Sequence, residues 1–289
     1  MWIIYASASA FFAGVTAILA KCGMKRTGGT VATAVRTIVV LAFAWLMVFA
    51  KGVQPNFGEI SSRTWIFLIL SGLATGASWL CYFEALQLGD VNKVVPIDKS
   101  STVLTVLLAF LLLGEAVSLL GGVGVVCIAG GTFLMLEKKP LEASEQKKGG
   151  GVWLILAVLS AVFASLTAIL GKIGISDVNS DLGTAIRTGV VLVMAWMMVF
   201  VTGKTDEVRG IPGRELLFIC ISGLSTGASW LFYYRALQLG PASVVVPIDK
   251  LSILVTVLFS YFILKEKLSR RSAVGLVLIT LGTLVMTLA

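Results

Sequence analysis

Ten stretches of about 19 mostly apolar residues follow one another along the chain. Each is long enough to cross a bilayer as a helix, which needs about 20 residues. They lie at residues 2–20, 30–50, 65–83, 94–113, 119–136, 153–171, 182–201, 216–234, 244–264 and 273–288. A helix satisfies every backbone polar group internally, as lipid requires. The pattern therefore predicts an all-α integral membrane protein with ten transmembrane helices.

The small number of charged residues indicates the same class of protein. Of the 289 residues, 57% are hydrophobic and 13% are charged, whereas a soluble domain is about 25% charged. This composition excludes a soluble globule, a disordered chain and a nucleic-acid binder, and it makes the lipid bilayer the expected partner. The chain has no histidine, no CxxC pair among its four cysteines and no phosphate-binding glycine loop. We therefore expect no enzyme activity, no cofactor and no metal site.

The two halves of the chain are copies of one unit. A shift of 151 residues, without a gap, places Trp2 on Trp153, Arg36 on Arg187 and VVPIDK at 94–99 on the same letters at 245–250. Shared apolar composition would not preserve charged residues at fixed positions. The sequence therefore predicts two five-helix repeats, at residues 1–137 and 152–289, joined by a linker at 138–151 that is charged and then glycine-rich.

An odd number of helices in each repeat predicts that the second repeat enters the membrane inverted. Inverted repeats are typical of secondary transporters, whose substrates bind in a central cavity at the repeat interface. Loops on the side of the termini carry four basic residues and those on the opposite side carry fifteen; the four are Lys51, Arg63, Lys172 and Arg235. The positive-inside rule then predicts extracytoplasmic termini in a multi-pass protein of the inner or plasma membrane.

Each repeat places a few ionisable residues near its helix ends, and such residues within a membrane are candidates for function. The candidate substrate-binding or gating residues of this kind are Arg36, Glu84, Asp98, Lys99, Arg187, Arg235, Asp249 and Lys250. Asp98, Asp249 and Glu84 are the candidate proton carriers if transport is coupled to a proton gradient. The alternative is that an arginine–aspartate pair only locks two helices together while the lysines extend to the headgroups.

A proline stands two residues before each aspartate. Pro96 opens the fourth helix of the first repeat, and Pro247 opens that of the second. Proline lacks the backbone donor and frees a carbonyl, so both are predicted helix breaks that bind a polar ligand or flex.

Aromatic residues and glycines recur on the third helix of each repeat. Trp79 and Tyr82, repeated as Trp230 and Tyr233, lie three residues apart and share a helix face. They either line a central cavity and stack on a substrate or pack in the protein interior. GxxxG spacings at Gly72 and Gly223 predict close contact between helices.

An ordered set of short motifs in both halves resembles the EamA domain of the drug/metabolite transporter superfamily. The motifs are ALQLG (85–89 and 236–240), VVPID (94–98 and 245–249), the glutamates Glu115 and Glu266, and the glycines Gly124, Gly131, Gly275 and Gly282. Each half also resembles the five-helix, single-unit bacterial and archaeal transporters, so the chain looks like a fused antiparallel dimer. The resemblance implies a ten-helix basket with alternating access, amino-acid-like or drug-like substrates and cytoplasmic termini, whereas the charge count predicts the opposite orientation.

These observations favour a secondary active transporter that exports a small metabolite, amino-acid-like or otherwise anionic or zwitterionic. Replacement of Glu84 by Arg235 between the repeats makes the second set of charges more positive and favours a carboxylate on the substrate. The first alternative is an exporter of cationic drugs. The second is a membrane scaffold subunit without transport activity. Coupling to a proton or ion gradient is an open expectation, and a fused dimer predicts that the monomer is sufficient.

Overall fold

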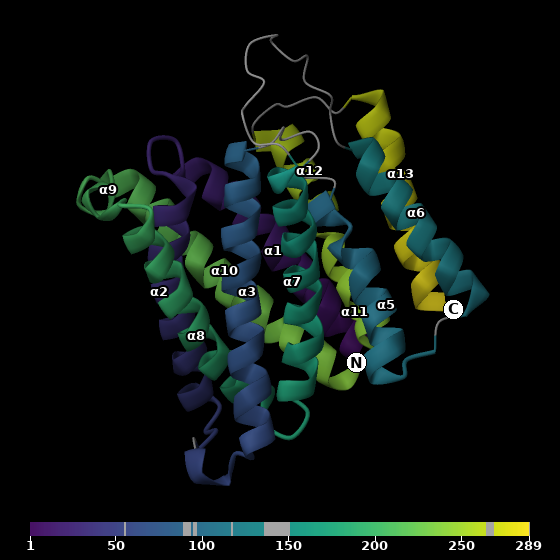
Figure 1. Cartoon of the computed structure of the whole chain (residues 1–289), viewed down its shortest axis with the longest axis horizontal. Coiled ribbons are helices and arrows are strands. Elements are labelled where there is room, and N and C mark those ends of the chain that lie inside the picture. The colour runs from purple at the N-terminus through teal and green to yellow at the C-terminus, as the bar shows by residue number, and fades with distance from the viewer. Residues whose placement is uncertain are drawn as a thin grey trace. The chain divides into compact units, whose positions relative to one another are not determined.

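The computed structural model describes residues 1–54, 56–88, 94, 97–116, 118–135, 151–263 and 269–288. Within these ranges the chain is entirely helical (Figure 1). The helices of the first half are α1 (Trp2–Gly23), α2 (Gly29–Ala50), the short η1 (Phe57–Glu59), α3 (Ser62–Leu88), α5 (Ser101–Leu113) and α6 (Leu119–Met135). Those of the second half are α7 (Val152–Gly174), α8 (Ser180–Val201), α9 (Thr205–Arg209), α10 (Gly213–Leu239), α11 (Ala242–Lys250), α12 (Ser252–Ile263) and α13 (Arg270–Leu288).

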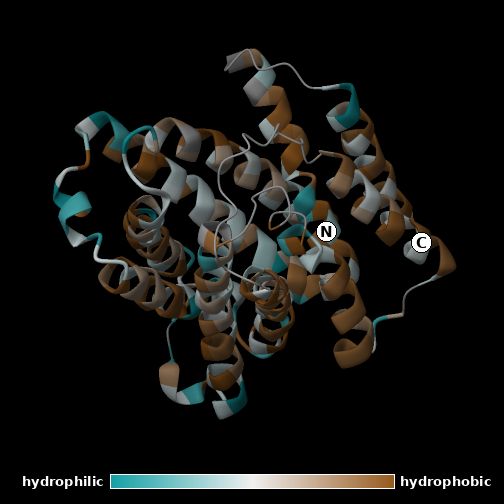
Figure 2. Cartoon of the chain, turned by 45° about the horizontal axis from the view of Figure 1, so that its top comes forward, coloured by the Kyte–Doolittle hydropathy of each residue, from teal (hydrophilic) through white to brown (hydrophobic). Residues whose placement is uncertain are grey.

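The membrane-spanning helices expected from hydropathy are present. Eight segments of the described residues are long and apolar enough to cross a membrane, and α6 is a shorter apolar helix of 17 residues. With α5 as the described part of the fourth expected span, the helix pattern agrees with ten spans. Figure 2 shows hydrophobic residues along most helices and hydrophilic ones in the connection that contains α9. Large apolar side chains such as Leu46, Leu111 and Val126 are more than 60% exposed, as lipid-facing residues are.

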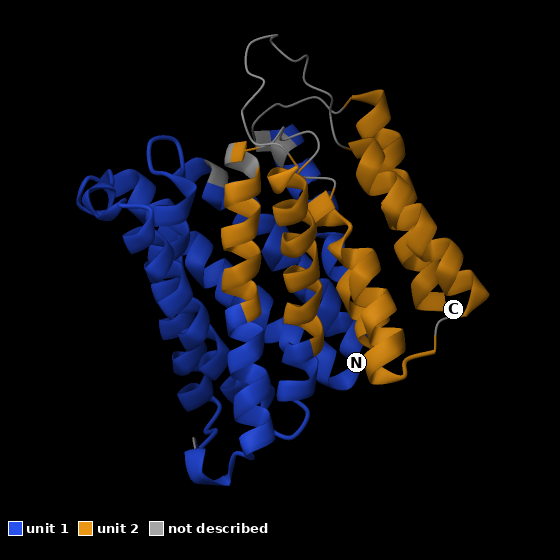
Figure 3. Cartoon of the chain, viewed as in Figure 1, with its two compact units in different colours: residues 1–73, 170–240, 248–266 blue, residues 74–169, 241–247, 267–289 orange. Residues whose placement is uncertain are grey.

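The chain divides into two compact units, coloured separately in Figure 3, which do not coincide with the two sequence repeats. Unit 1 comprises Met1–Leu73, Leu170–Gly240 and Ile248–Glu266, and unit 2 comprises Ala74–Ile169, Pro241–Pro247 and Lys267–Ala289. The division falls inside α3, α7 and α11. Each unit therefore combines helices from both repeats.

Unit 1 is held together by contacts between helices of different repeats. Helix α1 packs against α10 and α12, and α2 packs against α8 and α10. At Gly223 of α10, a Cβ atom would lie 2.7 Å from the Cβ of Val39 and 3.0 Å from the carbonyl oxygen of Arg36. The equivalent Gly72 of α3 would make the same clash with Val190 and the Arg187 carbonyl of α8. Both predicted close helix contacts are thus present, and both need glycine.

Unit 2 is built around the antiparallel pair α6 and α13. Four glycines of the family motif lie at their contact, where a Cβ at Gly131 would be 2.5 Å from the carbonyl oxygen of Gly275. Val106 of α5, Ile128 of α6 and Met286 of α13 form a buried cluster beside them. A second cluster, Ala85, Val94 and Ala157, connects α3 to α7.

Candidate functional site

Asp249, one of the two predicted intramembrane aspartates, is bound by a helix of the other repeat. The hydroxyl of Ser9 in α1 donates to Asp249 Oδ1 at 2.7 Å. Ser229 of α10 donates to the carbonyl oxygen of Ser9 at 3.1 Å, and the two hydroxyls are 3.2 Å apart. Both serines are buried. We call Asp249, Ser9 and Ser229 the Asp249 cluster; it lies within unit 1.

Asp98 is bound by an equivalent pair of serines within unit 2. The hydroxyl of Ser160 in α7 donates to Asp98 Oδ1 at 2.7 Å. Ser78 of α3 donates to the carbonyl oxygen of Ser160 at 3.0 Å. Each member of this Asp98 cluster stands 151 residues from its counterpart in the Asp249 cluster, so the second cluster repeats the first. In both clusters, a serine on the first helix of one repeat holds the aspartate of the other.

Sequence reasoning missed all four serines. The signal was available, because each serine is identical in the two copies and Ser78 and Ser229 stand inside the repeated segment TGASWL. A hydroxyl in an apolar helix is weak evidence alone, since it can bond to its own helix backbone.

The helix carrying Asp249 continues through Pro247 rather than ending there. Proline fits the helical φ angle and deprives only one carbonyl of its donor, and α11 ends at Lys250, three residues further on. At Leu251, the only residue between α11 and α12, the N–H donates to the carbonyl of Ile248 at 2.9 Å. The equivalent Ser100 makes the same short-range bond to Ile97 at 3.1 Å. Pro96 lies outside the described residues.

Arg187 is buried in unit 1 among aromatic rings. Its side chain is on α8, the residue is 2% exposed, and its Nε donates to the hydroxyl of Ser71 at 2.9 Å. The guanidinium carbon lies 5.2 Å from the ring centroid of Trp230 and 4.8 Å from that of Tyr234, both on α10. These distances are those of cation–π contacts, which are strongest when desolvated. Trp230 therefore packs on an arginine, which the sequence did not predict.

The remaining predicted residues divide between the two units. Tyr233 and Tyr234 each lie within electrostatic range of both Asp249 and Arg187, so the structure brings these four residues together. In the same way Tyr82 lies within range of Asp98, and the Lys99 ammonium is 3.8 Å from Asp98 Oδ2.

Lys250 likewise lies within electrostatic range of Asp249. Three other predicted residues show no such grouping: Arg36 and Trp79 are partly buried and Glu84 is exposed. Their roles stay predictions.

A pocket of about 350 Å³ in unit 1 contains Arg235. It combines charged and aromatic residues from four helices and their connections: Tyr5, Phe43, Met47, Lys51, Val53, Asn179, Ser180, Asp181, Ala228, Leu231, Phe232 and Arg235. Lys51 pairs with Asp181 at 2.8 Å, and Arg235 donates to the Gln238 side chain at 2.6 Å. Lys51 and Asp181 were not predicted as site residues.

Among the residues that the structure describes, no three of the types cysteine, aspartate and glutamate come together as metal ligands would. Each of the two aspartates instead accepts a hydrogen bond from a serine hydroxyl.

These features define a multi-pass α-helical membrane protein made of two repeats, with one serine–carboxylate cluster in each structural unit. Comparison with known families gives the particular class. The model of the EamA-like transporter family matches residues 1–137 and 151–288. The chain belongs to that family.

The relatives include half-length and longer proteins. An uncharacterized transporter of Sinorhizobium sp., encoded in the cobO 3' region, is 46% identical over 134 residues, which are 46% of this chain and 95% of that protein. Magnesium transporter NIPA4 of Mus musculus is 24% identical over 93% of this chain and 64% of its own length. The chain thus spans about two thirds of NIPA4.

A solved structure supports the fold. A protein crystal structure matches with a TM-score of 0.80 over 98% of this chain and 96% of that one, at 18% identity. At this identity the likeness shows the fold alone.

Proposed function

We propose that the protein is a secondary active transporter that exports a small amino-acid-like or related zwitterionic or anionic metabolite by alternating access. The observation that carries the proposal is the pair of equivalent serine–aspartate clusters. In each, one short hydrogen bond joins a helix of the first repeat to a helix of the second. Two equivalent links suit a protein that alternates between two states.

The chemistry of these links explains how a ligand changes the state. A carboxylate that accepts a hydroxyl hydrogen bond is also the group that binds a proton or a substrate ammonium. A substrate ammonium competes with Ser9 for Asp249, or with Ser160 for Asp98, and a proton weakens the serine bond because it removes the carboxylate charge. Loss of the serine bond releases α1 from α11, or α7 from the helix at residues 97–99. Alternating access follows if one cluster is broken while the other stays intact.

The charged pocket of unit 1 suits a zwitterionic substrate. Its volume falls within the range of small-molecule sites, which is about 300–1,000 Å³. Lys51 and Arg235 attract a carboxylate, and Asp181 attracts an ammonium group. Tyr5 stacks with Phe232 at 6.1 Å between ring centroids, which gives an apolar side chain a surface to contact.

The decisive experiment is transport by the purified protein in liposomes. A panel of amino acids, organic acids, quaternary cations and Mg²⁺ is presented with and without a pH gradient. We expect gradient-dependent movement of an amino or organic acid, and its loss in Asp249→Asn and Asp98→Asn while both variants express and fold. Proton-coupled transport that is unchanged in both variants would contradict the role of the clusters.

The other compounds in the panel decide between functions. Movement of quaternary cations alone supports the cationic drug exporter, and movement of Mg²⁺ supports the activity for which NIPA4 is named. If the protein transports none of these compounds and a second protein co-purifies with it in a fixed ratio, the scaffold-subunit function is supported. Activity at one chain per liposome tests whether the monomer is sufficient. Fusing a fluorescent protein that folds only in the cytoplasm to the C-terminus tests the proposed extracytoplasmic termini.

A further inference from the structure

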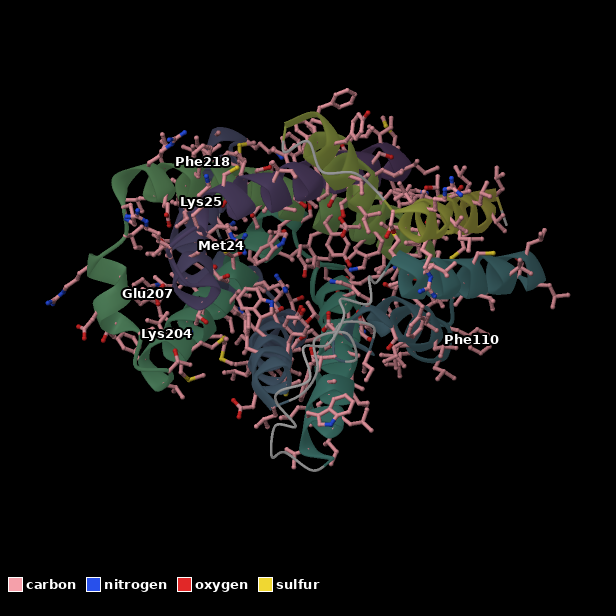
Figure 4. All side chains as sticks on the ribbon, turned by 90° about the horizontal axis from the view of Figure 1, so that it is seen from above. Met24, Lys25, Phe110, Lys204, Glu207 and Phe218 are labelled. Carbon is pink, nitrogen blue, oxygen red and sulfur yellow. The ribbon has the colours of Figure 1, made fainter. Side chains whose placement is uncertain are left out.

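A second pocket lies in unit 1 where α1 ends and α10 begins, and its volume is about 260 Å³. Its lining consists of Lys25, Arg26, Arg214, Glu215, Cys22, Pro212 and Phe218. In the view of Figure 4, the labelled Lys25 and Phe218 lie close together at this end of the two helices. The pocket thus joins three basic side chains to an apolar wall at the end of two membrane-spanning helices.

The carboxylate of Glu215, the acidic residue among those lining this pocket, already accepts hydrogen bonds from neighbouring residues. Glu215 accepts hydrogen bonds from the Thr27 hydroxyl at 2.7 Å, from the Thr27 N–H at 3.0 Å and from the Arg26 N–H at 3.2 Å. These bonds direct the Glu215 charge toward the backbone between α1 and α2, and the residue is only 7% exposed. The carboxylate therefore fixes the backbone that carries Lys25 and Arg26.

The three basic side chains remain available to an external anion. Ion pairs between the described residues, at 4.0 Å or less, join Lys51 to Asp181 and Lys99 to Asp98, and none involves Lys25, Arg26 or Arg214. All three residues are exposed. Lysine and arginine make charge-assisted hydrogen bonds to phosphate oxygens, so three of them around one cavity match a phosphate group.

The apolar side of the pocket distinguishes a lipid from a soluble anion. Phe218 forms part of the wall, and the preceding α10 residues Leu216 and Leu217 are 39% and 59% exposed. Acyl chains need such a surface next to the headgroup, whereas a soluble phosphate does not. Basic pockets between transmembrane helices are a recognised form of anionic lipid site.

The pocket is not a general property of the repeat. The positions equivalent to Lys25 and Arg26 in the second repeat are Ser176 and Asp177, and only Arg214 has a basic counterpart, Arg63. The second repeat therefore lacks two of the three basic residues at the equivalent positions.

We propose that this pocket binds the phosphodiester group of an anionic phospholipid, with Lys25, Arg26 and Arg214 around the phosphate and Phe218 beside the first acyl segment. The site is separate from the serine–aspartate clusters and does not depend on the proposed substrate.

Native mass spectrometry of the purified full chain tests this directly. The protein is titrated with phosphatidylglycerol and with phosphatidylcholine of the same acyl chains. We expect phosphatidylglycerol to bind at least about tenfold more tightly, because each basic residue near a membrane surface contributes about fivefold. The triple variant Lys25→Gln, Arg26→Gln, Arg214→Gln removes this preference.

A matched control removes three other exposed basic residues expected on the same membrane face, through Arg209→Gln, Arg270→Gln and Arg271→Gln. It should keep the affinity for phosphatidylglycerol within about twofold. If the triple variant fails to fold, Lys25→Gln alone serves, because its side chain takes no part in the Glu215 hydrogen bonds; it should lower the affinity about fivefold.

Three outcomes would overturn the proposal. Equal binding of the two lipids would show that the protein does not recognise the headgroup charge. Equal losses of affinity in the triple and control variants would show that the lipid does not bind in this pocket. Displacement of the lipid by an equal concentration of soluble glycerol phosphate shows a phosphate site without lipid specificity. None of these measurements requires transport, so a failure here is distinguishable from a failure of the proposed function.

Discussion

The Asp249 and Asp98 clusters are built from identical residues and have different neighbours. Asp249 lies in unit 1 with Tyr233 and Tyr234, which are also within range of the buried Arg187. Asp98 lies in unit 2 with Lys99, whose side chain is 50% exposed while that of Asp98 is 17% exposed. Asp249 also lies within electrostatic range of Lys250. The two clusters therefore share a neighbouring lysine and differ in the buried Arg187, which lies near the tyrosines of the Asp249 cluster.

This difference shows how a duplicated unit acquires two distinct sites. The serine–aspartate bond is retained in both copies because the same helices meet in both. The neighbouring residues have changed: Tyr234 corresponds to Phe83, and Arg235 to Glu84. The copies therefore keep the same link between repeats while the charge around the link differs, which suits two states of unequal stability.

The largest effect should come from removing the buried cation of unit 1. Arg187→Gln loses a hydrogen bond from a charged group and two cation–π contacts, and we expect about 3 kcal/mol of destabilisation. The equivalent Arg36→Gln should cost less than half of this, because Arg36 is partly exposed. Thermal unfolding in detergent, followed by tryptophan fluorescence, measures both. Equal losses would mean that burial does not distinguish the two arginines.

The serine hydroxyls should come next. Ser9→Ala and Ser160→Ala each remove a hydrogen bond to a carboxylate, which is worth about 1.5–3 kcal/mol. We expect transport to fall about tenfold or more in each variant, because both aspartates lose the hydroxyl that joins the two repeats. Initial rates in liposomes provide the measurement. Ser165→Ala is the control, since its hydroxyl donates to backbone carbonyls, and a comparable loss there would contradict the role of the carboxylates.

A smaller effect should follow from giving the second repeat a residue of the first. Tyr234→Phe introduces the residue found at position 83 and removes the hydroxyl that bonds to Ser71. Since Tyr234 is 2% exposed, we expect a loss of about 1 kcal/mol. Unfolding in detergent measures it, with Tyr261→Phe at a site 57% exposed as control. A Tyr234→Phe protein as stable as the control would show that the hydroxyl has no structural role.

The smallest effect is expected at the exposed pair of unit 2. Lys99→Gln removes an ion pair at 3.8 Å with a half-exposed lysine, and such pairs contribute about 0–1 kcal/mol. Unfolding in detergent at low and high salt should differ little from the unaltered protein. A loss of about 3 kcal/mol, equal to the loss expected for Arg187→Gln, would show that the exposed and the buried cation contribute alike and would contradict the comparison.

Much of the fold could be predicted from the sequence, and less of the candidate site. Apolar segments of fixed length predict helices because lipid leaves the backbone no other partner, and the shift of 151 residues is enough to pair Asp98 with Asp249. Pro247 shows the limit. Its missing donor is evident in the sequence, yet α11 continues to Lys250 because the neighbouring turns tolerate one lost hydrogen bond.

The sequence by itself determined the class of protein, the two repeats and the two aspartates, since these depend on local composition and on comparing the chain with itself. Tertiary structure alone decided that Ser9 meets Asp249 and that Ser160 meets Asp98, because 240 and 62 residues separate the partners. The same holds for Arg187 between Trp230 and Tyr234. Contacts between helices depend on how their faces pack, and a hydroxyl or a ring in an apolar segment has no partner until the helices come together.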